Sequence, residues 1–334
     1  MQIGIVVIGR NEGERLLRCL RSVQGQGPAV VYVDSGSEDG SPARAAALGV
    51  RVVELDASAP YTAARGRNAG IESLAHTNPD LEAMQVVDGD CELQRDWIEA
   101  ASAFLASHPD VAVVCGRRRE RHPEASPWNL VTDVEWDTPP GEIDACGGDA
   151  MIRLDAWRSA GGYDATLIAG EDPEFCYRVR GLGGRIVRLD REMTLHDAAL
   201  LHASQWWRRM ARGGHAYAAV VSLHRRAAPE RQLRQLASVA FWGGLLPLAS
   251  VLLALPTGGW SLAGLAALAK PWLGAWRETR RRRPPRVAAL YATACVLGKL
   301  AEFQGVATYV WNHALLRRGT RLIEYKGPDS ARPG

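Results

Sequence analysis

Several sequence patterns that identify common nucleotide-binding and metal-binding folds are missing from this chain. No Gly-x-Gly-x-x-Gly follows the first apolar run, and no Gly-Lys-Ser/Thr motif occurs in the 334 residues. The first absence argues against a dinucleotide-binding fold, and the second argues against a P-loop nucleotidase. The six cysteines include no Cys-x-x-Cys pair. Their scatter favours reduced cytosolic thiols over a disulfide framework or a zinc site.

The charge pattern gives little support for a nucleic-acid partner. The formal net charge is only +3, and the arginine clusters border apolar segments instead of alternating with aromatic residues. We therefore expect no binding to DNA or RNA. The length suits one large domain with an appendage. Because the N-terminal half has no signal peptide, we expect it to stay in the cytosol.

The N-terminal part alternates apolar, β-branched runs with helical patterns. Such alternation predicts an α/β fold with a mostly parallel sheet and right-handed crossovers. Ligands of these sheets bind outside the carboxyl ends of the strands. We expect strands over residues 2–8, 30–33 and 50–55 and a fourth ending at Asp88, with helices after residue 13 and over residues 42–48 and 63–74.

Polar side chains gather at the expected strand ends. Asn11 and Glu12 follow the first strand, Asp34 ends the second, and Asp88 and Asp90 flank a glycine after the fourth. Hard oxygen ligands in such a position suit Mg²⁺ or Mn²⁺ carrying a substrate's phosphates. For Asp34, a turn or helix-capping role is the alternative.

In their order along the chain, these motifs resemble family 2 glycosyltransferases with the GT-A fold. The first motif departs from the family, because Gly9-Arg10 stands where many relatives have a proline and an aromatic residue. That departure leaves the identity of the nucleotide open. The matching segments are residues 6–12, 33–41, 64–71, 87–90, 147–153 and 161–178, all within the first 215 residues.

The resemblance implies roles for individual residues. The family's chemistry inverts the anomeric carbon in one in-line displacement, with Asp172 in the position of the base that accepts the acceptor's proton. A divalent cation, Mn²⁺ or Mg²⁺, would neutralise the departing diphosphate. The implied nucleotide-sugar residues are Asn11, Glu12, Asp34, Arg67, Asn68, Asp88, Gly148, Asp149, Glu171 and Arg208, and the implied metal ligands are Asp90, Asp88 and His196.

Simpler roles remain open for several of these residues. Pro173 suits a first helical turn, so Asp172 would lie at a helix N-terminus, where an N-cap role is the alternative. His196 is expected to end a short strand, and a structural histidine is the alternative to a metal ligand. Asp149 is equally compatible with a turn and Arg208 with an amphipathic helix. The arginines at 117–119 and 121 are expected to form a solvated face or loop.

The C-terminal third is strongly apolar. No charged residue occurs over residues 236–269, and a membrane-spanning helix needs about 20 apolar residues. We therefore expect a hydrophobic helical hairpin over residues 236–276, with a buried soluble helix pair as the alternative. The arginine cluster at residues 277–286 should stay cytoplasmic. Residues 287–315 are expected to form a helix in the membrane interface.

Together these patterns predict a GT-A catalytic domain over residues 1–225 and a helical membrane-association region over residues 226–334. The predicted function is metal-dependent, inverting transfer of a hexose from a nucleotide-sugar donor. The expected acceptor is a lipid-linked glycan or a polysaccharide at the cytoplasmic face of the cell membrane. Two alternatives stay open. A nucleotidyltransferase of related fold would need a lysine-rich phosphate loop, which residues 9–13 lack. The other is a non-catalytic membrane scaffold.

Overall fold

A computed structural model describes residues 1–27, 29–225 and 227–315 of the chain. Its contacts divide these residues into two compact units. The first unit contains residues 1–122 and 135–199, and the second contains residues 123–134 and the described residues from 200 onward. The end of the predicted membrane-association region, residues 316–334, lies outside the described residues. The predicted domain boundary at residue 225 stays a prediction.

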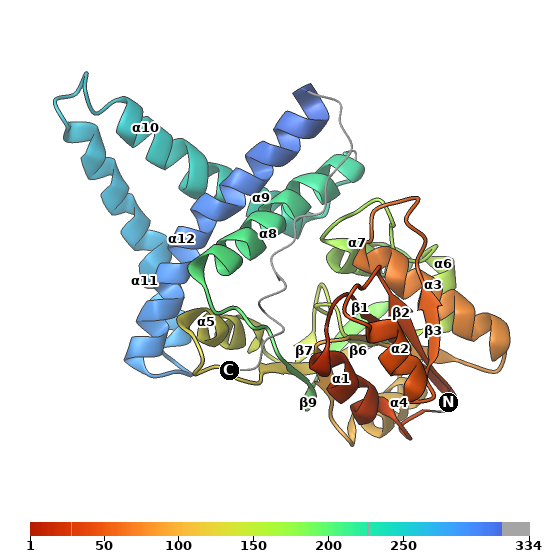
Figure 1. The fold of residues 1–334 in the computed structure, drawn as a ribbon. Coiled ribbons are helices and arrows are strands. Elements are labelled where there is room, and N and C mark those ends of the chain that lie inside the picture. The colour runs from red at the N-terminus through yellow and green to blue at the C-terminus, as the bar shows by residue number, and fades with distance from the viewer. Residues whose placement is uncertain (28, 226, 316–334) are drawn as a thin grey trace. The chain divides into compact units, whose positions relative to one another are not determined.

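The described residues of the first unit form a 9-stranded sheet (Figure 1). Its strand order is β3-β2-β1-β4-β8-β6-β9-β5, and β7 pairs with β9 away from this path. The strands are β1 (Ile3–Gly9), β2 (Ala29–Asp34), β3 (Arg51–Glu54), β4 (Ala83–Asp88), β5 (Cys91–Leu93), β6 (Val111–Glu120), β7 (Gly141–Glu142), β8 (Ala150–Arg153) and β9 (Arg185–His196).

One half of the sheet is parallel, as the alternating sequence pattern predicted. β1 pairs in parallel with β2 and β4, and β2 pairs in parallel with β3. The interiors of β1 and β2 are buried because helices cover both faces of a parallel sheet, which explains their unbroken apolar runs. The expected α/β fold with a mostly parallel sheet is therefore confirmed.

The other half mixes strand directions. β8 lies antiparallel between β4 and β6, and β9 runs parallel to β6 but antiparallel to β5. A strand ends at His196, as expected, but the expected short length was wrong, since β9 has 12 residues. Irregularities in the β6–β9 register let β9 follow β6 along its length and still reach β5 with its last residues.

Helices cover the sheet of the first unit. α3 approaches β1 closely because Gly70 has no side chain, since a Cβ there would lie 2.3 Å from Val6 Cγ1. Leu16 and Leu20 of the first helix are fully buried against the sheet. The helices are α1 (Glu14–Val23), α2 (Ser41–Ala47), α3 (Ala63–Thr77), α4 (Trp97–Ser107), α6 (Leu154–Ser159) and α7 (Glu171–Gly181).

The described part of the second unit is helical. It contains the first residues of α5 (Pro127–Trp136) and the helices α8 (Ala203–Leu223), α9 (Glu230–Ser238), α10 (Leu246–Leu252), α11 (Ala269–Thr279) and α12 (Pro285–Val310). A π-helical segment, η1 (Val239–Leu245), joins α9 to α10. A 3₁₀ segment, η2 (Trp260–Leu268), precedes α11, and η3 (Trp311–Leu315) follows α12.

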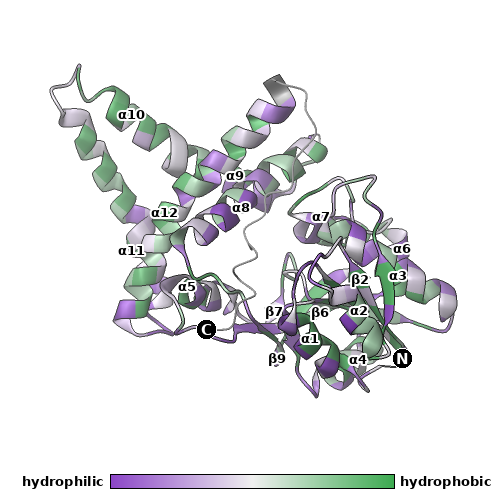
Figure 2. Cartoon of the chain, in the orientation of Figure 1, coloured by the Kyte–Doolittle hydropathy of each residue, from purple (hydrophilic) through white to green (hydrophobic). Residues whose placement is uncertain are grey.

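One helix in the described residues is long and apolar enough to cross a membrane. It runs continuously over Glu230–Leu252, with a mean hydropathy of 1.5 in its most apolar window, of which 22% is buried. A buried core helix of a soluble protein can pass the same test of length and composition. The low burial distinguishes this helix from such a core element. Figure 2 shows that α10 is mainly hydrophobic.

α8 and α12 meet at glycines. A Cβ on Gly214 of α8 would lie 1.9 Å from the carbonyl oxygen of Glu302, and a Cβ on Gly305 of α12 would lie 1.8 Å from that of Ala211. The two backbones therefore touch directly. Close approach through small residues is a packing mode that membrane helices use frequently.

Candidate active site

The first two strand ends carry tightly hydrogen-bonded loops. The main-chain N–H of Asn11 donates to Ser37 Oγ at 2.9 Å, and Asn11 Oδ1 accepts from the Glu38 N–H at 2.8 Å. Asp34 Oδ1 accepts from the Tyr32 hydroxyl at 2.6 Å, and Oδ2 accepts from the Ser37 N–H at 2.7 Å. Asp34 Oδ2 thus holds the turn after β2, as the turn alternative expected, and Oδ1 holds the Tyr32 side chain of the same strand. Its role toward a nucleotide stays a prediction.

Glu12 and Asn68 also have partners within the protein. Glu12 pairs with Arg15 at 2.9 Å. The Asn68 side-chain amide donates to the Tyr163 carbonyl at 2.8 Å and accepts from the Tyr163 N–H at 2.9 Å. Asn68 therefore fastens α3 to the loop before α7, and nucleotide contacts by Glu12 and Asn68 remain predictions.

Arg67 connects two carboxylates from different parts of the unit. Its Nη2 lies 2.9 Å from Asp88 Oδ1 and its Nη1 lies 2.6 Å from Glu171 Oε1, with only 3% of its side chain exposed. Burial by itself would lower the pKa of Arg67, but the attraction of the two carboxylates raises that pKa well above its usual value. The guanidinium stays charged, and it holds the end of β4 beside the start of α7.

A second arginine, Arg118, reaches the same carboxylate. Its Nη2 lies 2.8 Å from Asp149 Oδ2 and 3.5 Å from Asp88 Oδ2, and its guanidinium stacks over Trp136 at 5.3 Å. The expectation of a solvated arginine face was wrong for Arg118. Side chains alternate along β6, so Arg118 points into the site while Arg119 points away and is exposed.

Asp149 connects several of these groups through its carboxylate. It is fully buried, with 0% exposed. Its Oδ1 accepts from the main-chain N–H of Asp88 at 2.9 Å, and its Oδ2 accepts from the Thr194 hydroxyl at 2.9 Å in addition to Arg118. These partners leave Asp149 holding the end of β4, and a direct contact of Asp149 with a sugar stays a prediction.

Gly148 lies where the two arginines converge. Its φ is +103°, a conformation that L side chains rarely adopt, and a Cβ would lie 3.1 Å from Arg118 Nη2 and 3.3 Å from Arg67 Nη2. Only glycine allows the loop to pass this close to both guanidinium groups. The predicted residues brought together here are Arg67, Asp88, Gly148, Asp149 and Glu171.

Next to this cluster, three buried side chains form a candidate metal centre. His196 Nε2 lies 3.1 Å from Asp90 Oδ2, and His196 Nδ1 lies 3.5 Å from Glu120 Oε2. Strand pairing explains the meeting, because His196 is registered with Cys91 of β5 on one side and Glu120 of β6 on the other. Glu120 was not among the predicted site residues, although it shares the inward face of β6 with Arg118.

The donor set fits a divalent cation. Adjacent ligands of an octahedral ion at about 2.1 Å lie about 3.0 Å apart, close to the separation of Asp90 Oδ2 and His196 Nε2. Cys91 completes the group of candidate ligand atoms among the described residues. Glu120 stands where a ligating histidine usually finds a carboxylate partner. Asp88 lies outside this group, since its carboxylate faces the two arginines, and its role as a ligand stays a prediction.

Asp172 lies in the first turn of α7, whose N-cap is Gly170. The N-cap alternative for Asp172 was therefore wrong. Its Oδ2 accepts from the Gly147 N–H at 2.7 Å, and its Oδ1 accepts from the Cys146 thiol at 2.6 Å. Burial raises the pKa of Asp172, although the hydrogen bond from Cys146 and the charge of Arg67 oppose that rise. A carboxylate with a raised pKa is a stronger base.

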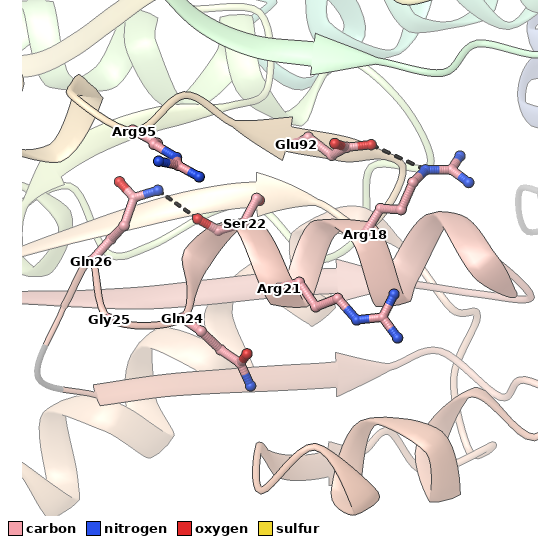
Figure 3. A pocket seen from close by; sticks show the side chains of 8 residues that line it. All are labelled: Arg18, Arg21, Ser22, Gln24, Gly25, Gln26, Glu92 and Arg95. Atoms are coloured by element: carbon pink, nitrogen blue, oxygen red, sulfur yellow. Dashed lines mark hydrogen bonds and ion pairs between the residues drawn. The ribbon is translucent and has the colours of Figure 1, made fainter.

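Two further features involve other residues. Arg208 is on α8 in the second unit, where its Nε donates to the Ser204 carbonyl at 3.3 Å, and its diphosphate contact stays a prediction. A cavity of about 620 Å³ opens between α1 and β5, where Arg18 pairs with Glu92 (Figure 3). None of its lining residues is a predicted site residue.

Residues 4–156 match the sequence profile described as glycosyl transferase family 2. The chain carries a family 2 glycosyltransferase domain. Its fold is the GT-A fold, and the resemblance drawn from the sequence motifs is confirmed. The matched residues include both strand-end loops, the Asp88 and Asp90 motif and the strand that follows Asp149.

Two curated relatives and one solved structure are similar to this chain. A TPR repeat-containing protein of Synechococcus elongatus is 33% identical over 150 residues, which are 42% of this chain and 35% of that protein. The succinoglycan biosynthesis protein ExoA of Rhizobium meliloti is 29% identical over 161 residues, 48% of this chain and 46% of ExoA. The chain thus matches less than half the length of either relative.

The solved structure is the mannosyltransferase PcManGT of Pyrobaculum calidifontis, in complex with GDP-Man and Mn²⁺. It aligns with 93% of this chain and 87% of its own chain, with a TM-score of 0.57 and 16% sequence identity. At this identity the likeness establishes the fold.

Proposed function

We propose that this protein is an inverting, metal-dependent glycosyltransferase that uses a nucleotide-sugar donor. The observation that carries the proposal is the meeting of a buried base candidate, Asp172, with a buried arginine-carboxylate cluster, in a chain whose residues 4–156 match the family 2 profile. Arg67 joins these parts, because it pairs with Asp88 at the strand end and with Glu171 beside Asp172. The Mn²⁺ and GDP-Man in the PcManGT complex agree with the proposal.

On the donor side, Asp90 and His196 would hold the cation, with Glu120 orienting the imidazole. The nitrogen ligand favours Mn²⁺ over Mg²⁺, which binds almost entirely through oxygen. When bound, the ion neutralises negative charge on the departing diphosphate. Arg118 and Arg67 add positive charge nearby, and their carboxylate partners hold both groups in fixed positions.

On the acceptor side, Asp172 would remove the proton from the attacking hydroxyl. The Gly147 N–H holds Asp172 Oδ2, and the Cys146 thiol holds Oδ1. Its raised pKa, caused mainly by burial, gives the carboxylate more affinity for that proton than an ordinary aspartate has. Glu171 is committed to Arg67, so Asp172 is the acid of the pair available for this role.

The second unit supports a lipid-linked or polysaccharide acceptor at the cytoplasmic face of the cell membrane. The helix over Glu230–Leu252 is long, apolar and little buried. Beyond it, Leu255 and Trp260 are exposed. Enzymes that act on lipid-linked acceptors benefit from membrane attachment, and ExoA is named for succinoglycan biosynthesis. We propose the boundaries expected from the sequence, with the catalytic domain ending at residue 225.

The proposal is tested by calorimetry with UDP-, GDP- and dTDP-sugars, with and without Mn²⁺, on the wild type and Asp90→Ala. We expect one nucleotide class to bind in a metal-dependent way and to bind at least tenfold more weakly to Asp90→Ala. Asp80→Ala is the matched control, because Asp80 is exposed and precedes β4, whereas Asp90 follows it. Failure of every nucleotide to bind would refute the transferase proposal and favour a non-catalytic scaffold.

A further inference from the structure

A second group of potential ligands surrounds the base candidate itself. Cys146 Sγ lies 3.7 Å from Cys176 Sγ and 2.6 Å from Asp172 Oδ1, and Cys176 Sγ lies 3.9 Å from the same oxygen. Asp172 and Cys176 are four residues apart on α7, so they share one face of the helix. Cys146 comes from the loop before β8. The separation of 30 residues hides this pair of cysteines from sequence patterns.

The separation of the two sulfurs matches a metal site. Two thiolates bound to one tetrahedral zinc ion at about 2.3 Å lie about 3.8 Å apart. A disulfide needs an S–S distance of about 2.0 Å. The observed 3.7 Å therefore suits two ligands of one ion without movement of the sulfurs. One ligand atom from each of Cys146, Asp172 and Cys176 lies within 4.8 Å of the others.

We propose that Cys146, Cys176 and Asp172 bind a thiophilic divalent cation such as Zn²⁺, with a fourth position open to water. Each thiol that coordinates releases its proton to solvent. Thiolates select softer ions than Mg²⁺ or Mn²⁺, so this site differs in preference from the pair of Asp90 and His196. Cys146 is only half-buried and the adjacent Gly147 is exposed, which gives the ion a route from solvent.

An ion bound at this site would prevent Asp172 from acting as the base. Coordination replaces the hydrogen bond from the Cys146 thiol to Asp172 with metal bonds to both groups. A carboxylate oxygen that ligates a cation no longer accepts the acceptor's proton. The site would therefore make the enzyme sensitive to free zinc. This inhibitory consequence rests on the proposed function, whereas ion binding itself does not.

Cobalt spectroscopy tests the site directly. The metal-free full chain, kept reduced with a non-thiol reductant, is titrated with Co²⁺. We expect thiolate-to-cobalt charge-transfer absorption and the visible bands of tetrahedral Co²⁺, saturating at one equivalent and abolished by Zn²⁺. The bands should be lost in Cys146→Ala and in Cys176→Ala. Cys19→Ala is the matched control and should keep them, because Cys19 is a buried cysteine outside both groups of candidate ligands among the described residues. Absence of the bands, or their survival in either of the first two variants, overturns the proposal.

A second measurement needs no variant. Iodoacetamide should alkylate Cys146 in the metal-free chain, and Zn²⁺ should abolish that alkylation, as read by mass spectrometry. Unchanged alkylation of Cys146 also overturns the proposal. With a donor sugar in hand, Zn²⁺ should lower turnover at least tenfold, and a chelator should restore it. If no donor is turned over at all, the proposed function fails while the cobalt spectrum still decides the metal site.

Discussion

Arg67 is the side chain on which the cluster depends most. Replacing it with methionine removes the partner of Asp88 and Glu171 and leaves two carboxylates without their main neutralising charge. Breaking a buried ion pair from one side costs about 3–5 kcal/mol, so we expect Arg67→Met to lower the urea midpoint strongly. Arg44→Met is the control. Arg44 forms an exposed pair with Glu14, which is worth at most about 1 kcal/mol. Equal losses in both variants would contradict the prediction.

The charged form of Asp172, which would act as the base, should destabilise the folded protein because it is buried. Burial raises its pKa in the folded protein above the unfolded value. The stability that its protonated form contributes is fully present below the unfolded pKa and is lost as the pH rises through the folded pKa. Asp172→Asn should therefore melt at a higher temperature than the wild type at pH 8, with the gap shrinking toward pH 4.

The same variant should lose turnover by about 10²–10⁴-fold, the usual contribution of a general base. Thermal denaturation across this pH range and donor turnover are the two measurements. Asp144→Asn is the control, because Asp144 is an exposed carboxylate paired with Arg180 of α7. A fully active Asp172→Asn, or one less stable than the wild type at pH 8, would remove the carboxylate from the proposed role.

Among individual residues, the sequence predicted the acidic site residues better than the residues that contact them. The Asp88 and Asp90 motif was visible because it ends an apolar run, and the family resemblance pointed to Asp172. Arg118 and Glu120 were missed because a run of arginines looks solvated along the chain. Their two-residue spacing on a strand that ends in charged residues was the available signal. That strand lies inside the sheet, which the local pattern did not reveal.

Among the elements, the crossing of α8 and α12 gives the sharpest prediction. A methyl group on Gly214 would collide with the Glu302 carbonyl at 1.9 Å, so the backbones must separate. We expect Gly214→Ala to destabilise the second unit by about 1–3 kcal/mol, the usual cost of overpacking. At Gly213 an added methyl meets no described atom within 4 Å. Gly213→Ala should therefore be neutral or stabilising by up to about 1 kcal/mol, because alanine favours helix.

Melting temperatures of the two neighbouring variants provide the measurement. The design isolates packing, since both variants make the same chemical change on the same helix. A Gly214→Ala protein that melts with Gly213→Ala would show that the helices do not cross at this residue.

The prediction of secondary-structure elements succeeded for segments with a clear apolar pattern. The apolar β-branched runs gave β1, β2 and β3 to within two residues. The insertion of β8 between β4 and β6 was not foreseen, because a strand of four residues has too little pattern to reveal its direction or its neighbours. The length of β9 depends on irregular pairing with β6, which is a property of the sheet and not of the segment.

For the molecule as a whole, membrane attachment is the property to test. Leu245 and Leu248 lie on the apolar helix over Glu230–Leu252, and both are exposed, Leu245 to 63%. A lysine near the centre of a spanning helix costs about 2.5–3.5 kcal/mol. We expect the double variant Leu245→Lys, Leu248→Lys to lower the fraction that floats with anionic liposomes at least tenfold. Leu182→Lys is the control, since Leu182 is 62% exposed on the first unit. Unchanged flotation of the double variant would argue against insertion of this helix.

The candidate site joins segments that are far apart along the chain. Arg67 and Glu171 are separated by 104 residues, and Asp88 and Asp149 by 61. Closing such long loops costs entropy before the contacts repay it, so contacts of this kind form late in folding. The parallel strands β1 to β4 can assemble from the first 88 residues as the chain leaves the ribosome. The ligand pair of Asp90 and His196 must wait until β9 is made. A nascent chain should therefore form the parallel half of its sheet well before its candidate site, and donor binding would report completion of the first unit.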